Sequence, residues 1–307
     1  MKFIRSFNSL NNSKKLIHVI FQIKRYGSHF SEVPPALQIE PTNYCNLKCI
    51  CCASSRCKRK KGYMDLDLFK KVIDDAAQIG VRHVDLFLHG EPLLHPHLGE
   101  MVQYIKLKRL RVEIATNAMV LDKEKMYTIL HSGLDRNDRL RFSILGYSKE
   151  THEKIQRGVN HEKVIMNVLD FLELQKKSQA KGPTVKIGFC VIPENEHEKK
   201  IFMKYWREKV DRVMVTDASI SFREYKRKIN VTSPRKKYCW DFWARMTILW
   251  NGDVTVCCVD VDGDFVLGNL ENETIKEIWN NEQLMAIKEI HKERNFEKFP
   301  LCANCDF

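Results

Sequence analysis

No uncharged apolar run in the 307-residue sequence approaches the roughly 20 residues that a membrane-spanning helix requires. Internal repeats and low-complexity segments are also absent. Hydrophobic residues make up 44% and charged residues 29% of the chain, which is the composition of a globular protein. We therefore expect no transmembrane segment, and the composition excludes a wholly disordered or fibrous protein.

The first 31 residues contain no acidic side chain. Their apolar stretch, Leu16–Ile23, is interrupted by His18 and Gln22, and no small-residue cleavage site follows it. We predict a basic amphipathic helix within residues 1–35 of a cytoplasmic protein. Such a helix would pack on the main domain or bind a membrane surface or a partner.

Basic residues outnumber acidic ones by 51 to 39, which gives a net charge of +12. Part of this excess lies in Ser221–Lys237, where seven Lys and Arg accompany a single acid, Glu224. We expect residues 217–238 to form a basic connector that is either solvated or suited to a phosphate or nucleotide sugar. Because no aromatic surface interleaves with these charges, we expect no nucleic-acid partner.

Short apolar segments alternate with helical patterns between about residues 36 and 216. This alternation predicts a parallel sheet with crossover helices, arranged as an open (β/α)6 sheet or part of a barrel. Active residues are then expected at the carboxyl ends of the strands. The predicted strands are Ala36–Glu40, His83–Leu88, Arg111–Thr116, Arg139–Ile144, Thr184–Ile192 and Arg212–Val215. The predicted helices are Asp65–Ile79, Pro96–Lys108, Asp122–His131, His161–Ala180 and Glu196–Lys209.

Eleven cysteines are many for a chain without an export signal, and in a reducing compartment their spacing indicates metal or redox chemistry. Cys45, Cys49 and Cys52 form a C-x3-C-x2-C pattern just after the first predicted strand. Three thiolates on one loop can bind three irons of a [4Fe–4S] cluster and leave the fourth open to a cofactor or substrate. A zinc site is the alternative, although structural zinc would require a fourth ligand.

At these three cysteines the sequence resembles the radical S-adenosylmethionine (SAM) superfamily, whose signature is this spacing in a (β/α)6 partial TIM barrel. Later segments agree in order: His89-Gly90-Glu91-Pro92 is similar to the family's GGEP turn, and Thr116-Asn117 to its TN(G) turn. The resemblance implies that SAM is bound by Gly90, Glu91, Pro92, Asn117, Ser143 and Arg157. In this scheme Glu91 meets the SAM amino group, Ser143 the ribose and Arg157 the carboxylate. Arg157 alone could equally be a surface arginine.

The sequence departs from the family pattern at several positions. His89 and Ala118 replace glycines of the two turns. Cys51 and Cys57 have no expected role, although Cys57 is near enough to the motif for a ligand exchange.

A second set of cysteines lies near the carboxyl end. Twelve residues separate Cys239 from Gly252, four more separate Gly252 from Cys257, and Cys302 and Cys305 form a C-x2-C pair. This resembles a shortened SPASM domain, of the twitch-like kind, and implies one fully ligated auxiliary [4Fe–4S] cluster within residues 239–307. Four-cysteine zinc stays open for this site, as does exchange of Cys257 for Cys258. We expect a small second domain with strands Met246–Trp250 and Val254–Cys257, a helix Ile275–His291, and metal-dependent folding.

The resemblance implies an enzyme that cleaves SAM to a 5′-deoxyadenosyl radical and oxidises a small alcohol, sugar or cyclitol, with the auxiliary cluster as electron acceptor. Such an enzyme needs an electron donor such as flavodoxin or ferredoxin. Candidate bases for the hydroxyl proton are Asp217, Glu224 and Asp260. A peptide-modifying maturase, for crosslinking or epimerisation, is the alternative, and a non-enzymatic metal scaffold is a third. The short segment before the first strand favours a small substrate over a peptide.

Overall fold

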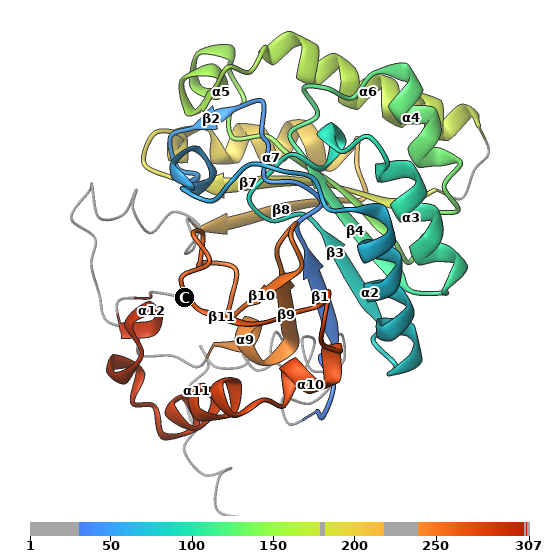
Figure 1. Ribbon diagram of the computed structural model, residues 1–307. Helices are drawn as coiled ribbons and strands as arrows, with labels where there is room; N and C mark the ends of the chain where they lie inside the picture. Colours follow the sequence, from blue (N-terminus) through green and yellow to red (C-terminus); the bar gives the residue numbers. More distant parts are fainter. Residues whose placement is uncertain (1–30, 179–181, 218–238, 304, 306–307) are drawn as a thin grey trace, which may run out of the picture.

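The computed structural model describes residues 31–178, 182–217, 239–303 and 305 (Figure 1). The predicted N-terminal helix falls almost entirely outside these residues, and so does the basic connector with Glu224. Within the described residues, no helix is long and apolar enough to cross a membrane.

Six parallel strands form the centre of the molecule (Figure 1). They lie side by side in chain order, each paired in parallel with the next, and this confirms the predicted (β/α)6 partial barrel. The strands are β1 (Ala36–Ile39), β3 (His83–Leu86), β4 (Arg111–Thr116), β5 (Arg139–Ser143), β7 (Thr184–Val191) and β8 (Arg212–Asp217).

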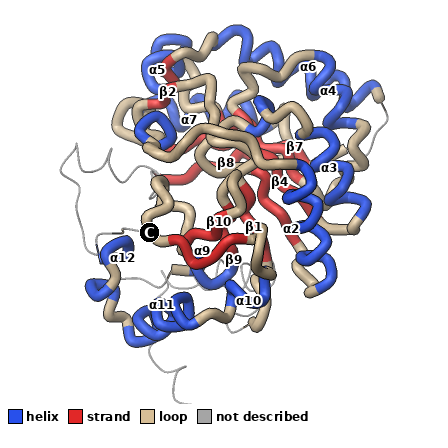
Figure 2. The backbone as a smooth tube through the Cα atoms, in the orientation of Figure 1, coloured by secondary structure: helices blue, strands red, loops and turns tan. Residues whose placement is uncertain are grey.

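Helices cover the outer face of these strands (Figures 1 and 2). Five of them match the predicted segments: α2 (Leu66–Gln78), α3 (Leu98–Leu107), α4 (Lys123–Leu130), α6 (His161–Lys177) and α7 (Lys199–Arg207). The sequence patterns did not predict the seven-residue helix α5 (Lys149–Ile155), which starts where the Ser148 side chain accepts a hydrogen bond from the Thr151 amide.

Side chains alternate along each strand between an apolar outer face and a polar inner face. On β1, Leu37 and Ile39 belong to the hydrophobic core beneath the helices, whereas Gln38 lines a cavity inside the barrel. On β5, Phe142 packs edge-on against Phe171 of α6, while Arg141 lines the same cavity. The barrel therefore has a dry outer core and a polar interior.

The carboxyl-terminal strands extend the barrel sheet beyond β1 (Figure 2). Strand β9 (Arg245–Ile248) pairs in parallel with β1, and β10 (Asp253–Thr255) and β11 (Val266–Asn269) follow it in antiparallel order. The sequence analysis expected strands over Met246–Trp250 and Val254–Cys257 in a small second domain. Because β9 covers the open edge of β1, the described part of residues 239–307 shares one sheet and one hydrophobic core with the barrel.

Short helices complete the carboxyl-terminal part: α9 (Trp240–Ala244), α10 (Ile275–Trp279), α11 (Glu282–Glu293) and α12 (Pro300–Ala303). The prediction of one helix over Ile275–His291 is wrong, because the chain breaks at Asn280 and Asn281. The side chain of Asn281 accepts a hydrogen bond from the Leu284 amide and so begins α11.

Candidate active site and metal centres

The first cysteine motif lies on the loop that follows β1, at the carboxyl end of the barrel strands. Cys49 belongs to β2 (Lys48–Cys49), which pairs with β6 (Gln156–Arg157). Cys52 caps the 3-10 helix η1 (Ala53–Arg56), and its sulfur accepts a hydrogen bond from the Ser54 amide at 3.4 Å. These contacts hold Cys45, Cys49 and Cys52 at one side of the barrel cavity, which all three line.

The three thiols form one electrostatic group. Burial raises the pKa of Cys45 to about 11, and the charges of Glu91 and Cys52 add to the rise. Burial, followed by the charges of Cys52 and Cys45, raises the pKa of Cys49 well above its usual range. Without metal these thiols stay protonated, so binding of a cluster must displace protons. Three soft donors on one loop fit three irons of a [4Fe–4S] cluster.

Gly90 occupies a position where no side chain fits. A Cβ atom there would come within 2.0 Å of the Thr42 carbonyl oxygen and 2.8 Å of the Tyr44 carbonyl oxygen. The next amide, that of Glu91, donates to the Tyr44 carbonyl at 2.8 Å, and Pro92 begins the 3-10 helix η2 (Pro92–Leu94). The predicted turn is therefore locked against the loop that carries Cys45.

The Glu91 carboxylate is engaged by the scaffold around it. It accepts hydrogen bonds from the Thr116 hydroxyl at 2.6 Å, the Asn117 amide at 2.7 Å and the Leu93 amide at 3.0 Å. Burial raises the pKa of Glu91 to about 6, although these bonds oppose the rise. Glu91 thus ties the end of β3 to the end of β4, and its predicted contact with the SAM amino group stays a prediction.

The other predicted SAM-binding residues divide into two groups. Asn117 and Ser143 line the barrel cavity beside the cysteine loop, and the Asn117 side-chain amide donates to Asn46 Oδ1 at 3.0 Å. Arg157 is exposed and is not among the residues that line the cavity, although its backbone pairs with Lys48 next to Cys49. Its pairing with the SAM carboxylate stays a prediction.

Two further cysteines of the first segment lie outside the C-x3-C-x2-C pattern, and one of them, Cys51, also lines the barrel cavity. Cys51 is fully buried and packs with Leu145, Ile155 and Ile192. The Cys57 sulfur donates to the Val261 carbonyl at 3.4 Å in the carboxyl-terminal part. Both contacts support roles in packing.

A second pocket is lined by five cysteines: Cys239, Cys257, Cys258, Cys302 and Cys305. Four of them are the predicted ligands of the auxiliary cluster, and a set of buried thiols suits iron–sulfur chemistry. Cys258 also lines the barrel cavity, whereas Cys257 is among the lining residues of the second pocket alone. This placement favours Cys257 over Cys258 as the ligand.

Asp241 and Arg245 connect the two pockets. Asp241 lines both, and its carboxylate lies 3.7 Å from the Cys258 sulfur and 2.9 Å from the Arg245 guanidinium. Arg245 also forms an ion pair with Asp85 on β3 at 3.0 Å. The sequence analysis did not select Asp241, because only the pairing of β9 with β1 brings it to the barrel cavity.

The candidate bases occupy different places. Asp260 is buried, and its carboxylate accepts hydrogen bonds from the Thr255 hydroxyl and the amides of Asp264 and Phe265, so it orders its own loop. Asp217 is the last residue of β8. Glu224 lies outside the described residues. The catalytic role of all three stays a prediction.

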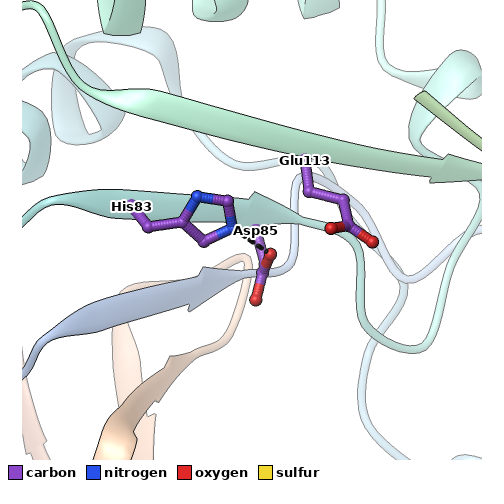
Figure 3. A group of neighbouring side chains, drawn as sticks. All are labelled: His83, Asp85 and Glu113. Atoms are coloured by element: carbon purple, nitrogen blue, oxygen red, sulfur yellow. Dashed lines mark hydrogen bonds and ion pairs between the residues drawn. The ribbon is translucent and has the colours of Figure 1, made fainter. Parts of the chain in front are cut away.

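Charged side chains fill the lower part of the barrel, below the cysteine loop. His83 and Asp85 of β3 lie beside Glu113 of β4, and His83 Nε2 is 2.7 Å from Asp85 Oδ1 (Figure 3). Three such groups could hold a metal ion, but Arg245 pairs with Asp85 and Lys186 pairs with Glu113 at 3.1 Å. Because cations already neutralise both carboxylates, this cluster closes the barrel floor as an ion network.

Comparison with known proteins identifies the family. The model of the radical SAM superfamily matches residues 39–205, more than half of the sequence, so the chain belongs to this superfamily. A second model, described as an iron–sulfur cluster-binding domain, matches residues 239–306. The chain is therefore a radical SAM enzyme that uses SAM and two [4Fe–4S] clusters.

Curated relatives are distant. A SAM-dependent 2-deoxy-scyllo-inosamine dehydrogenase of Niallia circulans is 23% identical over 288 residues, which cover 88% of this chain and 92% of that protein. A tungsten-containing aldehyde ferredoxin oxidoreductase cofactor-modifying protein of Pyrococcus furiosus is 34% identical over 100 residues, 32% of this chain and 28% of that protein. A probable GTP 3′,8-cyclase of Methanococcus maripaludis is 27% identical over 60% of this chain and 58% of its own length.

Solved structures share the fold. BtrN in complex with AdoMet and 2-DOIA has a TM-score of 0.63 at 21% identity, with 90% of this chain and 94% of that chain covered. Streptococcus suis SuiB bound to SAM has a TM-score of 0.68 at 16% identity, with coverage of 93% and 75%. The anSMEcpe enzyme with bound AdoMet has a TM-score of 0.63 at 18% identity, with coverage of 88% and 89%.

Proposed function

We propose that this enzyme oxidises a small polar substrate by two electrons inside the barrel, with the auxiliary cluster as the electron acceptor. The substrate class is a sugar, cyclitol or other alcohol. When bound, SAM and the clusters supply a hydrogen-abstracting radical and an electron sink. The protein holds the substrate, excludes water and receives the hydroxyl proton.

One observation carries the proposal: the two cysteine-lined pockets share two lining residues. Asp241 and Cys258 line both the barrel cavity and the pocket of Cys239, Cys257, Cys302 and Cys305. A substrate in the barrel is therefore separated from the proposed auxiliary cluster by about one layer of side chains. This proximity supports electron transfer from the substrate to that cluster.

Asp241 is the residue that we propose to accept the hydroxyl proton. It lines the substrate cavity, and its carboxylate is held in place by an ion pair with the Arg245 guanidinium at 2.9 Å. Asp260, by contrast, accepts three hydrogen bonds from its own loop. We therefore place Asp241 ahead of the three candidates chosen from the sequence.

The relatives support the proposal in part. The protein of Niallia circulans is named as a dehydrogenase and matches over almost its whole length. However, one SuiB structure is bound to a precursor peptide and one anSMEcpe structure to a peptide, which keeps a peptide-modifying activity as the second candidate. The barrel cavity, of about 410 Å³, accommodates a small molecule without any opening of the sheet.

We also propose that flavodoxin or ferredoxin is the electron donor.

The test is the stoichiometry of turnover. Reconstituted enzyme with reductant and a pool of candidate alcohols should form one 5′-deoxyadenosine for each product that has lost two hydrogen atoms, as followed by mass spectrometry. Asp241→Asn should retain SAM cleavage but reduce product formation by roughly 10²-fold or more. A product of unchanged mass, or turnover with a peptide alone, would replace this proposal with the second candidate.

A further inference from the structure

Arg141 projects from β5 into the barrel cavity, at a place that the cofactor assignments do not use. Its guanidinium carbon lies 4.5 Å from the centre of the Phe87 ring. Stacking on an aromatic ring holds the planar guanidinium in one orientation while its edge stays available to a ligand. The group is therefore ordered before any ligand arrives.

This guanidinium makes no hydrogen bond to another residue in the described part of the chain. Its Nε is buried without a hydrogen-bond partner, and its ion pair with Glu113 Oε1 is long, at 3.6 Å. The Glu113 carboxylate also forms ion pairs with Lys186 at 3.1 Å and with Arg139 at 3.6 Å. Three cations around one carboxylate leave positive charge at the floor of the cavity, and Arg141 presents up to five donors there.

A second polar group of the same cavity is also unsatisfied. Gln38 of β1 is 4% exposed, and its side-chain carbonyl oxygen Oε1 has no hydrogen-bond partner in the described residues. Gln38 lines the cavity and lies in register with Asp85 on β3. A buried polar atom without a partner costs free energy, so such atoms usually mark the place of a ligand or water.

From these groups we infer that the substrate carries an oxyanion, a carboxylate or a phosphate, which Arg141 binds. A hydroxyl or amino group of the same substrate donates to Gln38. The inference rests on the proposed function, in that the substrate is a small molecule held inside the barrel. The flat, stacked guanidinium favours two parallel hydrogen bonds to one oxyanion, which is the geometry that arginine provides and lysine does not.

The inference is tested on the holoenzyme with both clusters and saturating SAM. Equilibrium dialysis measures binding of two probes, radiolabelled inorganic phosphate and radiolabelled acetate. We expect one of them to bind in one copy per chain, and Arg141→Gln to weaken that binding at least tenfold, because charge-assisted hydrogen bonds are lost. The probe that binds identifies the kind of oxyanion.

Arg212→Gln is the matched control. Arg212 lies on β8, two strands from β5 in the same sheet, and is exposed, so this change removes the same charge without altering the cavity. It should leave probe binding unchanged. Failure of both probes to bind the wild-type holoenzyme, or equal binding by Arg141→Gln, would overturn the inference. Loss of SAM affinity in Arg141→Gln would also overturn it, because Arg141 would then bind the cofactor.

A second experiment separates this inference from the proposed function. Small molecules extracted from the source cells are fractionated on an anion exchanger, and each fraction is assayed for stimulation of 5′-deoxyadenosine formation. The active compound should be retained on the column, and phosphatase treatment should abolish its retention if the oxyanion is a phosphate. A retained compound that is epimerised would contradict the oxidation but support Arg141 as an anion anchor. A neutral compound that is oxidised would support the oxidation but contradict the role of Arg141 as an anion anchor.

Discussion

The Nε2 atom of His291 lies 3.2 Å from the Cys302 sulfur, in the pocket of the second cysteine set. His291 is fully buried, stacked on Phe242 with ring centres 4.5 Å apart and in edge contact with Phe296. A thiolate ligand cannot donate a hydrogen bond, so the ring nitrogen must donate once Cys302 binds a cluster. His291 is thus placed to tune the auxiliary cluster, since hydrogen bonds to sulfur influence cluster potential.

His291→Phe should lower the reduction potential of the auxiliary cluster, because removal of a donor leaves more negative charge on the Cys302 sulfur. The phenyl ring preserves the stacking on Phe242. A redox titration followed by electron paramagnetic resonance measures the shift, and the SAM-binding cluster serves as the internal reference. An unchanged potential would show that the 3.2 Å contact has no electronic effect.

Metal content should reflect two separate sites. Anaerobically reconstituted protein should contain about eight irons and eight sulfides, and alanine at Cys45, Cys49 and Cys52 should leave about four. Alanine at Cys51, which packs with Leu145, Ile155 and Ile192 and lies outside the C-x3-C-x2-C pattern, is the control and should retain both clusters. Four irons with one tightly bound zinc in the wild-type protein would contradict the assignment of the second pocket.

Glu91→Gln should destabilise the barrel by about 1–3 kcal/mol, because an amide cannot accept all three hydrogen bonds that the carboxylate receives. Loss of these hydrogen bonds should also weaken SAM binding, because the Gly90 turn would shift away from the cysteine loop. Thermal unfolding and SAM titration measure the two effects. Glu100→Gln, on the exposed surface of α3, is the control and should change neither the stability nor the SAM affinity. If Glu91→Gln is as stable as the wild-type protein and binds SAM equally well, Glu91 does not stabilise this part of the barrel.

Lys288 predicts a pH dependence of stability. Burial, with a smaller effect from Lys292, lowers the pKa of Lys288 from 10.5 to about 8 in the folded protein. The unfolded chain therefore binds the proton more tightly, and the free energy of unfolding should rise with pH between about 8 and 10.5. Lys288→Met should reduce this rise by up to about 3 kcal/mol, measured by urea unfolding at several pH values. Lys276→Met, at an exposed position, should keep the full slope.

The cysteine sets and the barrel could be predicted because their signals are local. The spacing of Cys45, Cys49 and Cys52 fixes them on one loop, and the alternation of strands and helices fixes the order of the sheet. The SPASM-type cysteines span more than 60 residues, but their spacing along the sequence is itself a motif, so this set could also be predicted. Comparison with known families confirms the radical SAM superfamily and the iron–sulfur cluster-binding domain.

The residues that connect the two pockets could not be predicted in the same way. Asp241 and Arg245 reach the barrel because β9 pairs with β1, more than 200 residues away in the chain. Arg141 gives a partial signal, a charge in the middle of a strand between Leu140 and Phe142. Only closure of the barrel shows that this charge faces a cavity and lacks a hydrogen-bond partner among the described residues.

The most direct test of the oxidative account compares Cys302→Ala with the wild-type enzyme in single turnovers, with 5′-deoxyadenosine and oxidised product measured in the same samples. Cys302 lines the auxiliary pocket and does not line the barrel cavity, so SAM cleavage should continue in the variant. We predict that 5′-deoxyadenosine forms while the ratio of oxidised product to 5′-deoxyadenosine falls at least tenfold, because the electron on the substrate has no acceptor. A variant that keeps the wild-type ratio, or a wild-type enzyme that regenerates SAM in each cycle, would contradict the account.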